Sequence, residues 1–236
     1  MKSFKLKPTR HNQSLDLLDG IATVYNAVNQ KNPIPTITQN KASYTSPVNV
    51  GSGIVSTSEL AKANFKTIKI GGKFGRLLGN PYNPFYLMIY GDRFNGKSSV
   101  AMLLANTLAK KKNKVLYISN EEGVKASLQE KLIRLNITSP IDFVEDYNAE
   151  MFGRYDAVFM DSTQTIGIKP EDFKELKHLY PGTSFIMVFK ANRDGSSKGG
   201  TDWEHDVDAI MHIENQSATM EKNRFPNGSN ETIKIF

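Results

Sequence analysis

The chain has 236 residues, no cysteine and a formal net charge of +6. The lack of cysteine excludes a disulfide framework and any thiolate zinc site, and no apolar run approaches the roughly 20 residues that span a bilayer. With 39% hydrophobic and 23% charged residues, the composition is typical of a globular protein. We therefore expect a cytoplasmic protein without a membrane segment.

The positive charge is concentrated in the first third of the chain. Residues 1–80 hold 11 Lys or Arg and 3 Asp or Glu, whereas the remainder holds 19 and 21. Residues 1–56 are rich in Asn, Gln, Pro, Ser and Thr, so we expect a poorly structured arm with a short helix at 14–28. Such an arm can attract nucleic acid, order on a neighbouring subunit, or remain solvated, and charge alone does not choose among these.

Residues 57–84 are expected to form a linker. A short helix is predicted at 57–65, capped by Thr57 or Ser58 with Glu59 in its first turn. A strand is expected at 65–70, followed by a connection rich in Gly and Pro at 71–84.

From residue 85 the pattern alternates between short apolar runs and amphipathic segments. Strands are predicted at 85–90, 114–119, 141–144, 155–161, 183–190 and 207–215, with helices at 98–112, 121–137 and 170–180. An antiparallel pair is expected from residues 218–225 and 231–236. The fold class is therefore α/β, with a mostly parallel central sheet flanked by helices and a C-terminal antiparallel hairpin, in one domain over 85–236.

The stretch "GDRFNGKSS" matches the P-loop pattern and lies between a predicted strand and a predicted helix. Backbone N–H groups of such a loop face the phosphates, the lysine reaches the β- and γ-phosphates, and the following serine ligates Mg²⁺. The loop interior is bulky, and Asp92 brings negative charge near the phosphates. The segment expected to hold ATP consists of Gly91, Asp92, Arg93, Phe94, Asn95, Gly96, Lys97, Ser98 and Ser99.

Carboxylates end two other predicted strands. Asp161 follows an apolar run and is predicted to be the Walker B aspartate, which holds Mg²⁺ together with Ser98. Glu121 follows another strand and is the candidate that orients or deprotonates water. Its neighbour Glu122 is better explained by the start of the next helix, where acidic residues are favourable.

Four segments carry a resemblance to a known family. "KVLYISNEE", "YDAVFMDSTQT", "FKANRDG…DWEHDVDAIMHIEN" and "EKNRF" occur in the order found in RadA/Sms, a RecA-superfamily ATPase. The stretch "EKNRFPNGSN" also resembles the motor domain of DnaB-type replicative helicases. The resemblance covers about residues 70–236 and implies a RecA-like ATPase core that uses ATP and Mg²⁺.

Carried over by position, the resemblance implies further roles. Glu121 matches the glutamate that activates water, and Lys190 and Arg193 fall where the family places sensor residues. Lys222 and Arg224 match residues that such proteins insert into a neighbour's ATP site. The alternative for Arg224 is a cross-strand charge partner within its own hairpin.

The chain also departs from the family pattern. It has no cysteine for the family's zinc finger, Lys190 stands where RadA has His, and Pro226 replaces a Gly. We expect a minimal, divergent member of phage or mobile-element type, in the cytoplasm of a bacterial or phage-infected cell.

Two loops are candidates for contact with nucleic acid. One is residues 162–172, and the other is residues 192–203, which carries Arg193 and Lys198 among Gly and Ser. A plain surface loop is the alternative, and Trp203 is more typical of a core residue or a loop anchor than of a stacking platform. We expect an oligomeric, ATP-hydrolysing motor on single-stranded DNA, a hexameric ring or filament with replication or recombination partners. The alternative is a KaiC-like assembly or signalling module with protein partners and no DNA dependence.

Overall fold

The structure, a computed structural model, describes residues 54–236. The predicted helix at 14–28 and nearly all of the expected arm lie outside the described residues. Within the described part, no helix is both long and apolar enough to cross a membrane. The division into an arm, a linker and a domain stays a prediction.

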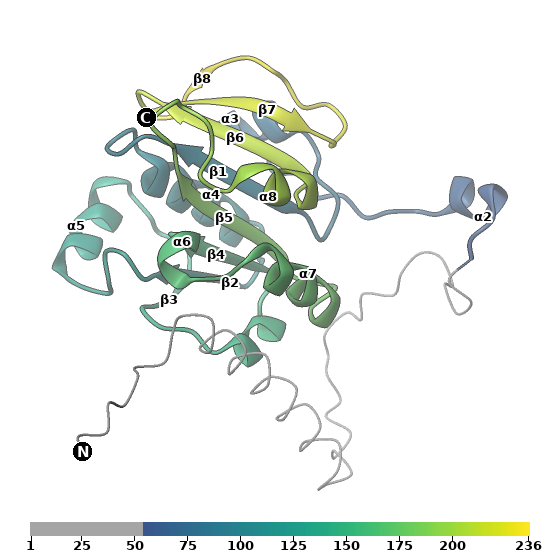
Figure 1. Cartoon of the computed structure of the whole chain (residues 1–236), viewed down its shortest axis with the longest axis horizontal. Helices are drawn as coiled ribbons and strands as arrows, with labels where there is room; N and C mark the ends of the chain where they lie inside the picture. The colour runs from purple at the N-terminus through teal and green to yellow at the C-terminus, as the bar shows by residue number, and fades with distance from the viewer. Residues whose placement is uncertain (1–53) are drawn as a thin grey trace, which may run out of the picture. The chain divides into compact units, whose positions relative to one another are not determined.

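The centre of the fold is a sheet in the order β3-β2-β4-β5-β1-β6-β7-β8 (Figure 1). Its first six strands in this order are parallel, and β7 and β8 are antiparallel. The predicted α/β class with a mostly parallel sheet and a C-terminal antiparallel hairpin is confirmed. The strands are β1 (Tyr86–Gly91), β2 (Val115–Ser119), β3 (Asp142–Val144), β4 (Ala157–Asp161), β5 (Ser184–Lys190), β6 (Ala209–Glu214), β7 (Ser217–Asn223) and β8 (Ile233–Lys234).

Helices cover both faces of the sheet (Figure 1). One face packs against α3 (Gly72–Leu78), α4 (Lys97–Lys110) and α5 (Ala126–Arg134). The other carries α7 (Pro170–Leu179) and α8 (Gly200–Asp206) through an aromatic cluster. The remaining elements are α2 (Thr57–Lys62), the 3₁₀ helix η1 (Ala149–Arg154) and α6 (Thr163–Ile166).

The central strands are apolar throughout because both faces are buried. Along β1, Leu87 and Ile89 belong to the core with α4, whereas Tyr86 lies edge-on to Phe173 of α7 on the other face. Trp203 is buried and stacks on Phe173, which confirms its prediction as a core residue.

Two predictions for the linker are wrong. The expected strand at 65–70 is only an isolated antiparallel bridge between Thr67 and Tyr82. The expected connection contains α3, whose apolar residues Phe74, Leu77 and Leu78 are buried in the core. Their spacing by three and four is helical, but the glycines around them hid the signal because glycine is usually a helix breaker.

Element ends also differ from the prediction. The cap of α2 is Ser56, rather than Thr57 or Ser58, and it forms a capping box with Glu59. A hairpin that we did not predict joins β6 to β7 through Asn215 and Gln216, whose φ angles are +47° and +63°. Two consecutive positive φ angles are the mark of a type I′ turn.

Candidate nucleotide-binding site

Most of the predicted site residues come from the carboxyl ends of four adjacent strands. The P-loop follows β1, Lys190 ends β5, Asp161 ends β4, and Glu121 follows β2, in the order β2-β4-β5-β1. Parallel strands end at the same edge of a sheet, so these side chains meet there. They surround a cavity of about 660 Å³ lined by Arg93, Phe94, Gly96, Lys97, Ser98, Ser99, Glu121, Glu122, Lys131, Arg134, Asp161, Ser162, Val188, Lys190, Gln216 and Phe236.

The loop leads directly into the first turn of α4. Gly96 has a φ of +92°, which favours glycine, and α4 begins at Lys97. The Lys97 ammonium donates a hydrogen bond to the Asp92 carbonyl oxygen at 2.6 Å. Burial lowers the pKa of Lys97, although the charges of Asp161, Glu121 and Asp92 act in the opposite direction. A lysine, a helix N-terminus and free loop N–H groups together form an anion-binding arrangement.

The bulky loop residues do not fill the cavity. Asp92, Arg93 and Phe94 are exposed, and Phe94 is completely so, with a φ of +66°. Arg93 and Phe94 border the cavity from outside the core. Because these bulky side chains are exposed, the cavity keeps room for a phosphate chain.

Asp161 is held in place by a residue that the sequence analysis missed. The Tyr117 hydroxyl donates to the Asp161 Oδ2 at 2.8 Å, and Ser98 is also hydrogen-bonded to this carboxylate. Burial raises the pKa of Asp161, and these two hydrogen bonds partly offset the rise. Burial also raises the pKa of Tyr117, so its hydroxyl stays protonated and remains a donor.

Ser98 and Asp161 fit the demands of Mg²⁺. Their hydroxyl and carboxylate oxygens are hard ligands and lie in mutual contact. Over residues 54–236 there is no group of three His, Cys, Asp or Glu that can hold a metal by itself. An Mg²⁺ ion here would take its remaining ligands from phosphate and water, as Mg²⁺ at nucleotide sites usually does.

Glu121 is paired with the residue that ends β5. Its carboxylate lies 2.8 Å from the Lys190 ammonium. Burial tends to raise the pKa of Glu121, but hydrogen bonds from Lys190 and Ser162 and the charge of Lys97 bring it below the usual value. The adjacent Glu122 forms an ion pair with Lys131 of α5. Glu121 is therefore an ionised carboxylate at the cavity wall.

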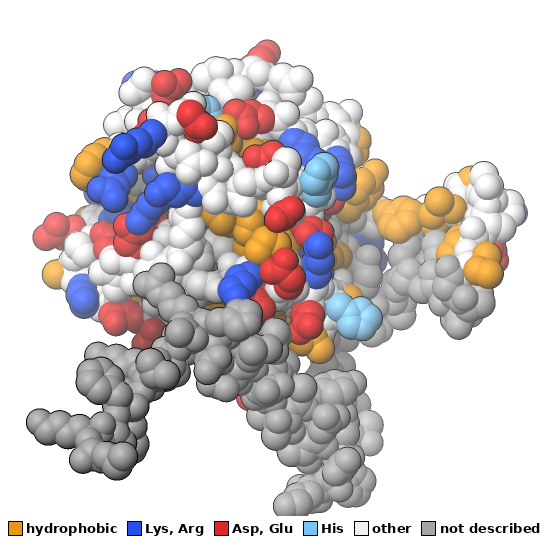
Figure 2. All heavy atoms as spheres, in the orientation of Figure 1, with side chains coloured by type: hydrophobic (Ala, Val, Ile, Leu, Met, Phe, Trp, Pro, Cys, Tyr) orange, Lys and Arg blue, Asp and Glu red, His pale blue; other side chains and the backbone are white. Residues whose placement is uncertain are grey.

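Further lining residues were not predicted from the sequence. Lys131 and Arg134 add positive charge from α5, and Figure 2 shows Lys and Arg side chains gathered between α5 and the C-terminal strands. The Gln216 N–H donates to the Asn95 carbonyl oxygen at 3.2 Å. The Phe236 ring lies beside the loop, so close that a Cβ atom added to Gly96 would be 2.7 Å from it. The cavity thus offers an aromatic wall next to the phosphate loop.

Of the predicted loop residues, Gly91, Asp92 and Asn95 do not line this cavity. Four predicted residues beyond the loop also lie outside it. Lys222 donates to the carbonyl oxygens of Glu204 and Val207, which fixes it within its own chain. Arg224 is exposed just beyond β7, and its N–H donates to the Asp208 carbonyl oxygen at the start of β6. The other two, Arg193 and Lys198, are exposed on the segment after β5.

The direction of β7 explains the position of Lys222 and Arg224. Because β7 runs antiparallel to β6, its end lies at the sheet edge opposite the P-loop. Neither residue therefore belongs to the candidate nucleotide cavity of its own chain.

Comparisons with known proteins find similarity to RadA. The chain is 27% identical to the DNA repair protein RadA of Bacillus subtilis (strain 168) over 195 residues, covering 70% of this chain and 42% of that protein. It is 29% identical to RadA of Campylobacter jejuni (strain NCTC 11168) over 179 residues, covering 64% and 39%. No protein-family profile matches the chain.

Solved structures with low sequence identity share the fold. The KaiC-like protein PH0186 of Pyrococcus horikoshii OT3 superposes with a TM-score of 0.53 at 16% identity, covering 72% of this chain and 94% of that one. The flagellar accessory protein FlaH of Methanocaldococcus jannaschii gives 0.54 at 13% identity, covering 71% and 92%.

The chain therefore shares its fold with these two solved structures and is similar in sequence to RadA. It spans about two-fifths of the length of the RadA proteins that it matches.

Proposed function

We propose that this chain binds and hydrolyses ATP, and that it works as an oligomeric motor on single-stranded DNA. The observation that carries the proposal is the meeting of Lys97, Asp161 and Glu121 around one cavity at the end of the parallel sheet. This combination supplies a phosphate cradle, a metal-side carboxylate and a candidate base.

Each residue has a separate role in hydrolysis. The loop N–H groups and Lys97 would hold the phosphates, and Ser98 and Asp161 would hold an Mg²⁺ ion, which would neutralise charge on the phosphates. Glu121 orients the attacking water and accepts its proton. Lys190 keeps Glu121 ionised and stands where a sensor residue belongs in the family. The Phe236 ring offers a face for the base.

The proposed oligomer follows from the place of Arg224. It lies exposed at the sheet edge away from its own P-loop, so a neighbouring copy is the partner whose nucleotide it can reach. A guanidinium aimed at the γ-phosphate stabilises the charge of the transition state. We propose that copies assemble into a hexameric ring or a filament with ATP between subunits. Lys222 supports the same segment from within its chain.

The proposed DNA contact uses the segment after β5. Arg193 and Lys198 are exposed there and can track a phosphate backbone without reading sequence. The relatives at 27% and 29% identity are named DNA repair proteins, which supports a role in recombination or replication. The proposed location is the cytoplasm of a bacterial or phage-infected cell.

Two neighbouring glutamates provide a matched test of the site. We expect Glu121→Gln to lower ATP turnover by about 10²-fold or more, the usual effect of losing a general base. Glu122→Gln, which removes the same charge one residue away, should change turnover by only a few fold. Equal loss in both variants, with both folded, would overturn the assignment of Glu121.

The alternative is an ATP-gated assembly module of the KaiC-like kind. Such a protein would hydrolyse ATP at a rate that ignores DNA, and its partners would be proteins. The response of turnover to single-stranded DNA separates the two functions.

A further inference from the structure

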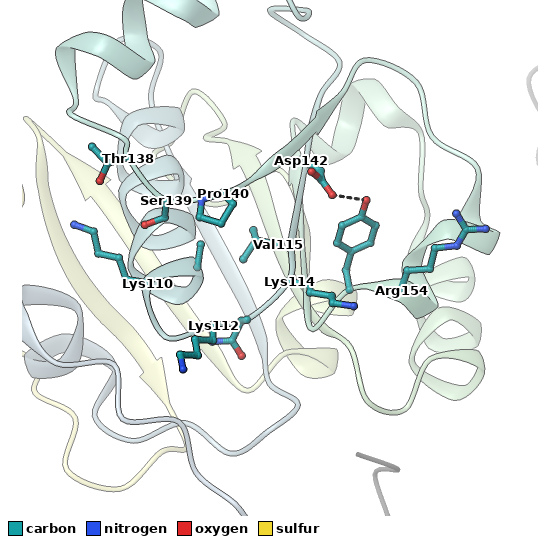
Figure 3. Close-up of a pocket in the computed structure, with 12 residues that line it drawn as sticks. Lys110, Lys112, Lys114, Val115, Thr138, Ser139, Pro140, Asp142 and Arg154 are labelled. Carbon is teal, nitrogen blue, oxygen red and sulfur yellow. Dashed lines mark hydrogen bonds between the residues drawn. The ribbon is translucent and has the colours of Figure 1, made fainter. Parts of the chain in front are cut away.

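A second cavity, of about 790 Å³, lies at the opposite end of α4 from the P-loop (Figure 3). It opens where α4 ends and where β2 and β3 begin. Because α4 has 14 residues, the two cavities lie about 20 Å apart along one helix. The second is lined by Ala109, Lys110, Lys112, Asn113, Lys114, Val115, Thr138, Ser139, Pro140, Asp142, Arg154 and Tyr155.

The charge of this cavity is strongly positive. Four of its lining residues are basic, and Asp142 is the single acidic one. The Asp142 carboxylate already accepts a hydrogen bond from the Tyr155 hydroxyl at 2.9 Å. Among residues 54–236, no ion pair within 4.0 Å involves Lys110, Lys112, Lys114 or Arg154.

The basic side chains come from more than one element. Lys110 is the last residue of α4, where a cation is favourable because of the helix dipole. That explanation does not extend to Lys112 and Lys114, which follow the helix, or to Arg154, which ends η1. Favourable interaction with the helix C-terminus therefore does not explain why all four cations lie around one cavity.

The spread of these cations indicates the shape of the ligand. Figure 3 shows Lys110 and Lys112 on one side of the hollow, Arg154 on the other side and Lys114 between them. A small phosphate needs donors that converge on one point, whereas this row suits several charges spaced along a chain. The Tyr155 ring, anchored through its hydroxyl by Asp142, adds a surface on which a base can stack.

We propose that this cavity binds the phosphodiester backbone of a single-stranded nucleic acid. The choice of nucleic acid as the polyanion rests on the proposed function, whereas the positive charge and the hollow shape do not. A duplex is too wide to enter a hollow of this size, but one strand can lie in it. The helix α4 would then connect this strand directly to the ATP site.

Protection from acylation tests the proposal on the full, unmodified chain. An oligothymidylate probe is added, surface lysines are acetylated briefly, and mass spectrometry measures each lysine. We expect slower acetylation of Lys110, Lys112 and Lys114, but not of Lys125 and Lys234, which are exposed elsewhere. Inorganic phosphate at the same phosphate concentration and phosphatidylserine vesicles should give no such protection.

The outcomes separate this proposal from the proposed function. Protection of Lys198 without protection of the three cavity lysines would overturn the second site and leave the DNA motor standing. Binding of no oligonucleotide at all would overturn both. Protection by vesicles but not by the oligonucleotide would show a lipid surface as the ligand and would also overturn the proposal.

A pair of matched variants gives the energetic test. Lys110→Gln with Arg154→Gln removes one cation from each side, and Lys125→Gln with Lys234→Gln removes the same charge elsewhere. The first pair should weaken oligothymidylate binding roughly tenfold near 0.1 M salt and reduce the salt slope by about 1.4, since each contact to a single strand contributes about 0.7. Equal binding and equal slopes for the two pairs would contradict the proposal.

Discussion

The Lys190 ammonium lies 2.8 Å from the Glu121 carboxylate, so the end of β5 is linked to the segment after β2 at the proposed nucleotide cavity. This pair lowers the pKa of Glu121 against the effect of burial. The state of the proposed base therefore depends on a residue from a different strand.

Removal of this cation should shift the pH dependence of turnover. In Lys190→Met the pKa of Glu121 rises, so Glu121 becomes protonated at a higher pH and the acid limb of the kcat profile moves upward. Lys190→Arg should leave the limb close to its original position. A lower kcat in Lys190→Met with an unmoved acid limb would show that Lys190 acts in some other way.

The charged Asp161 carboxylate should lower the stability of the folded protein. Its pKa is raised in the folded state, so the charged form destabilises the fold at pH values above that pKa, and the effect fades as pH falls through it. We expect Asp161→Asn without nucleotide to melt at a higher temperature than the wild type at pH 7, with a smaller gap at low pH. Added Mg²⁺ and ATP analogue should stabilise the wild type but not the variant. A lower melting temperature in Asp161→Asn would contradict this account.

Mixing two inactive variants should test the shared site. Lys97→Ala removes the phosphate lysine, and Arg224→Ala removes the residue proposed to act in a neighbour. In mixed assemblies some interfaces contain both intact halves, so ATP turnover should exceed that of either variant alone. If both variants are folded and assembled but mixing does not raise ATP turnover, the proposed role of Arg224 in a neighbour's site is contradicted.

Lys222, near the end of β7, provides the contrast with Arg224. Because its ammonium holds two carbonyl oxygens within its own chain, Lys222→Ala should lower the melting temperature, whereas Arg224→Ala should not. The comparison separates a structural lysine from the proposed trans-acting arginine.

Gly91 has a structural role apart from any ligand. A Cβ atom at Gly91 would lie 2.2 Å from the Ile213 carbonyl oxygen of β6. We expect Gly91→Ala to lower the free energy of unfolding by about 3 kcal/mol or more, as over-packing does at its upper end. Gly167→Ala, at a φ of +86° with open space around it, carries only backbone strain of about 1–2 kcal/mol. Equal losses measured by denaturant unfolding would show that the Ile213 contact is easily relieved.

The sequence predicted the parts of this fold that depend on local pattern. The apolar runs became buried parallel strands, and the P-loop, Asp161 and Glu121 were placed by their positions at strand ends. Both signals are short-range, because a strand buried on two faces must be apolar throughout and a polar residue marks its end.

The remainder depended on contacts between distant segments. In the sequence, Tyr117 has the pattern of an ordinary strand residue. Only the pairing of β2 with β4 brings its hydroxyl to Asp161. Phe236 and Gln216 reach the P-loop because β6 runs beside β1 and the hairpin turns back. The row of cations from Lys110 to Arg154 is likewise visible only when η1 is placed beside the end of α4.

ATP turnover measured with and without single-stranded DNA, at a low and a high salt concentration, tests the central claim most directly. The account predicts that DNA raises turnover at low salt and that the increase shrinks at high salt, because the contacts are to phosphates. Turnover that is abolished by Lys97→Ala yet unchanged by saturating DNA at low salt would contradict the motor and favour the assembly module.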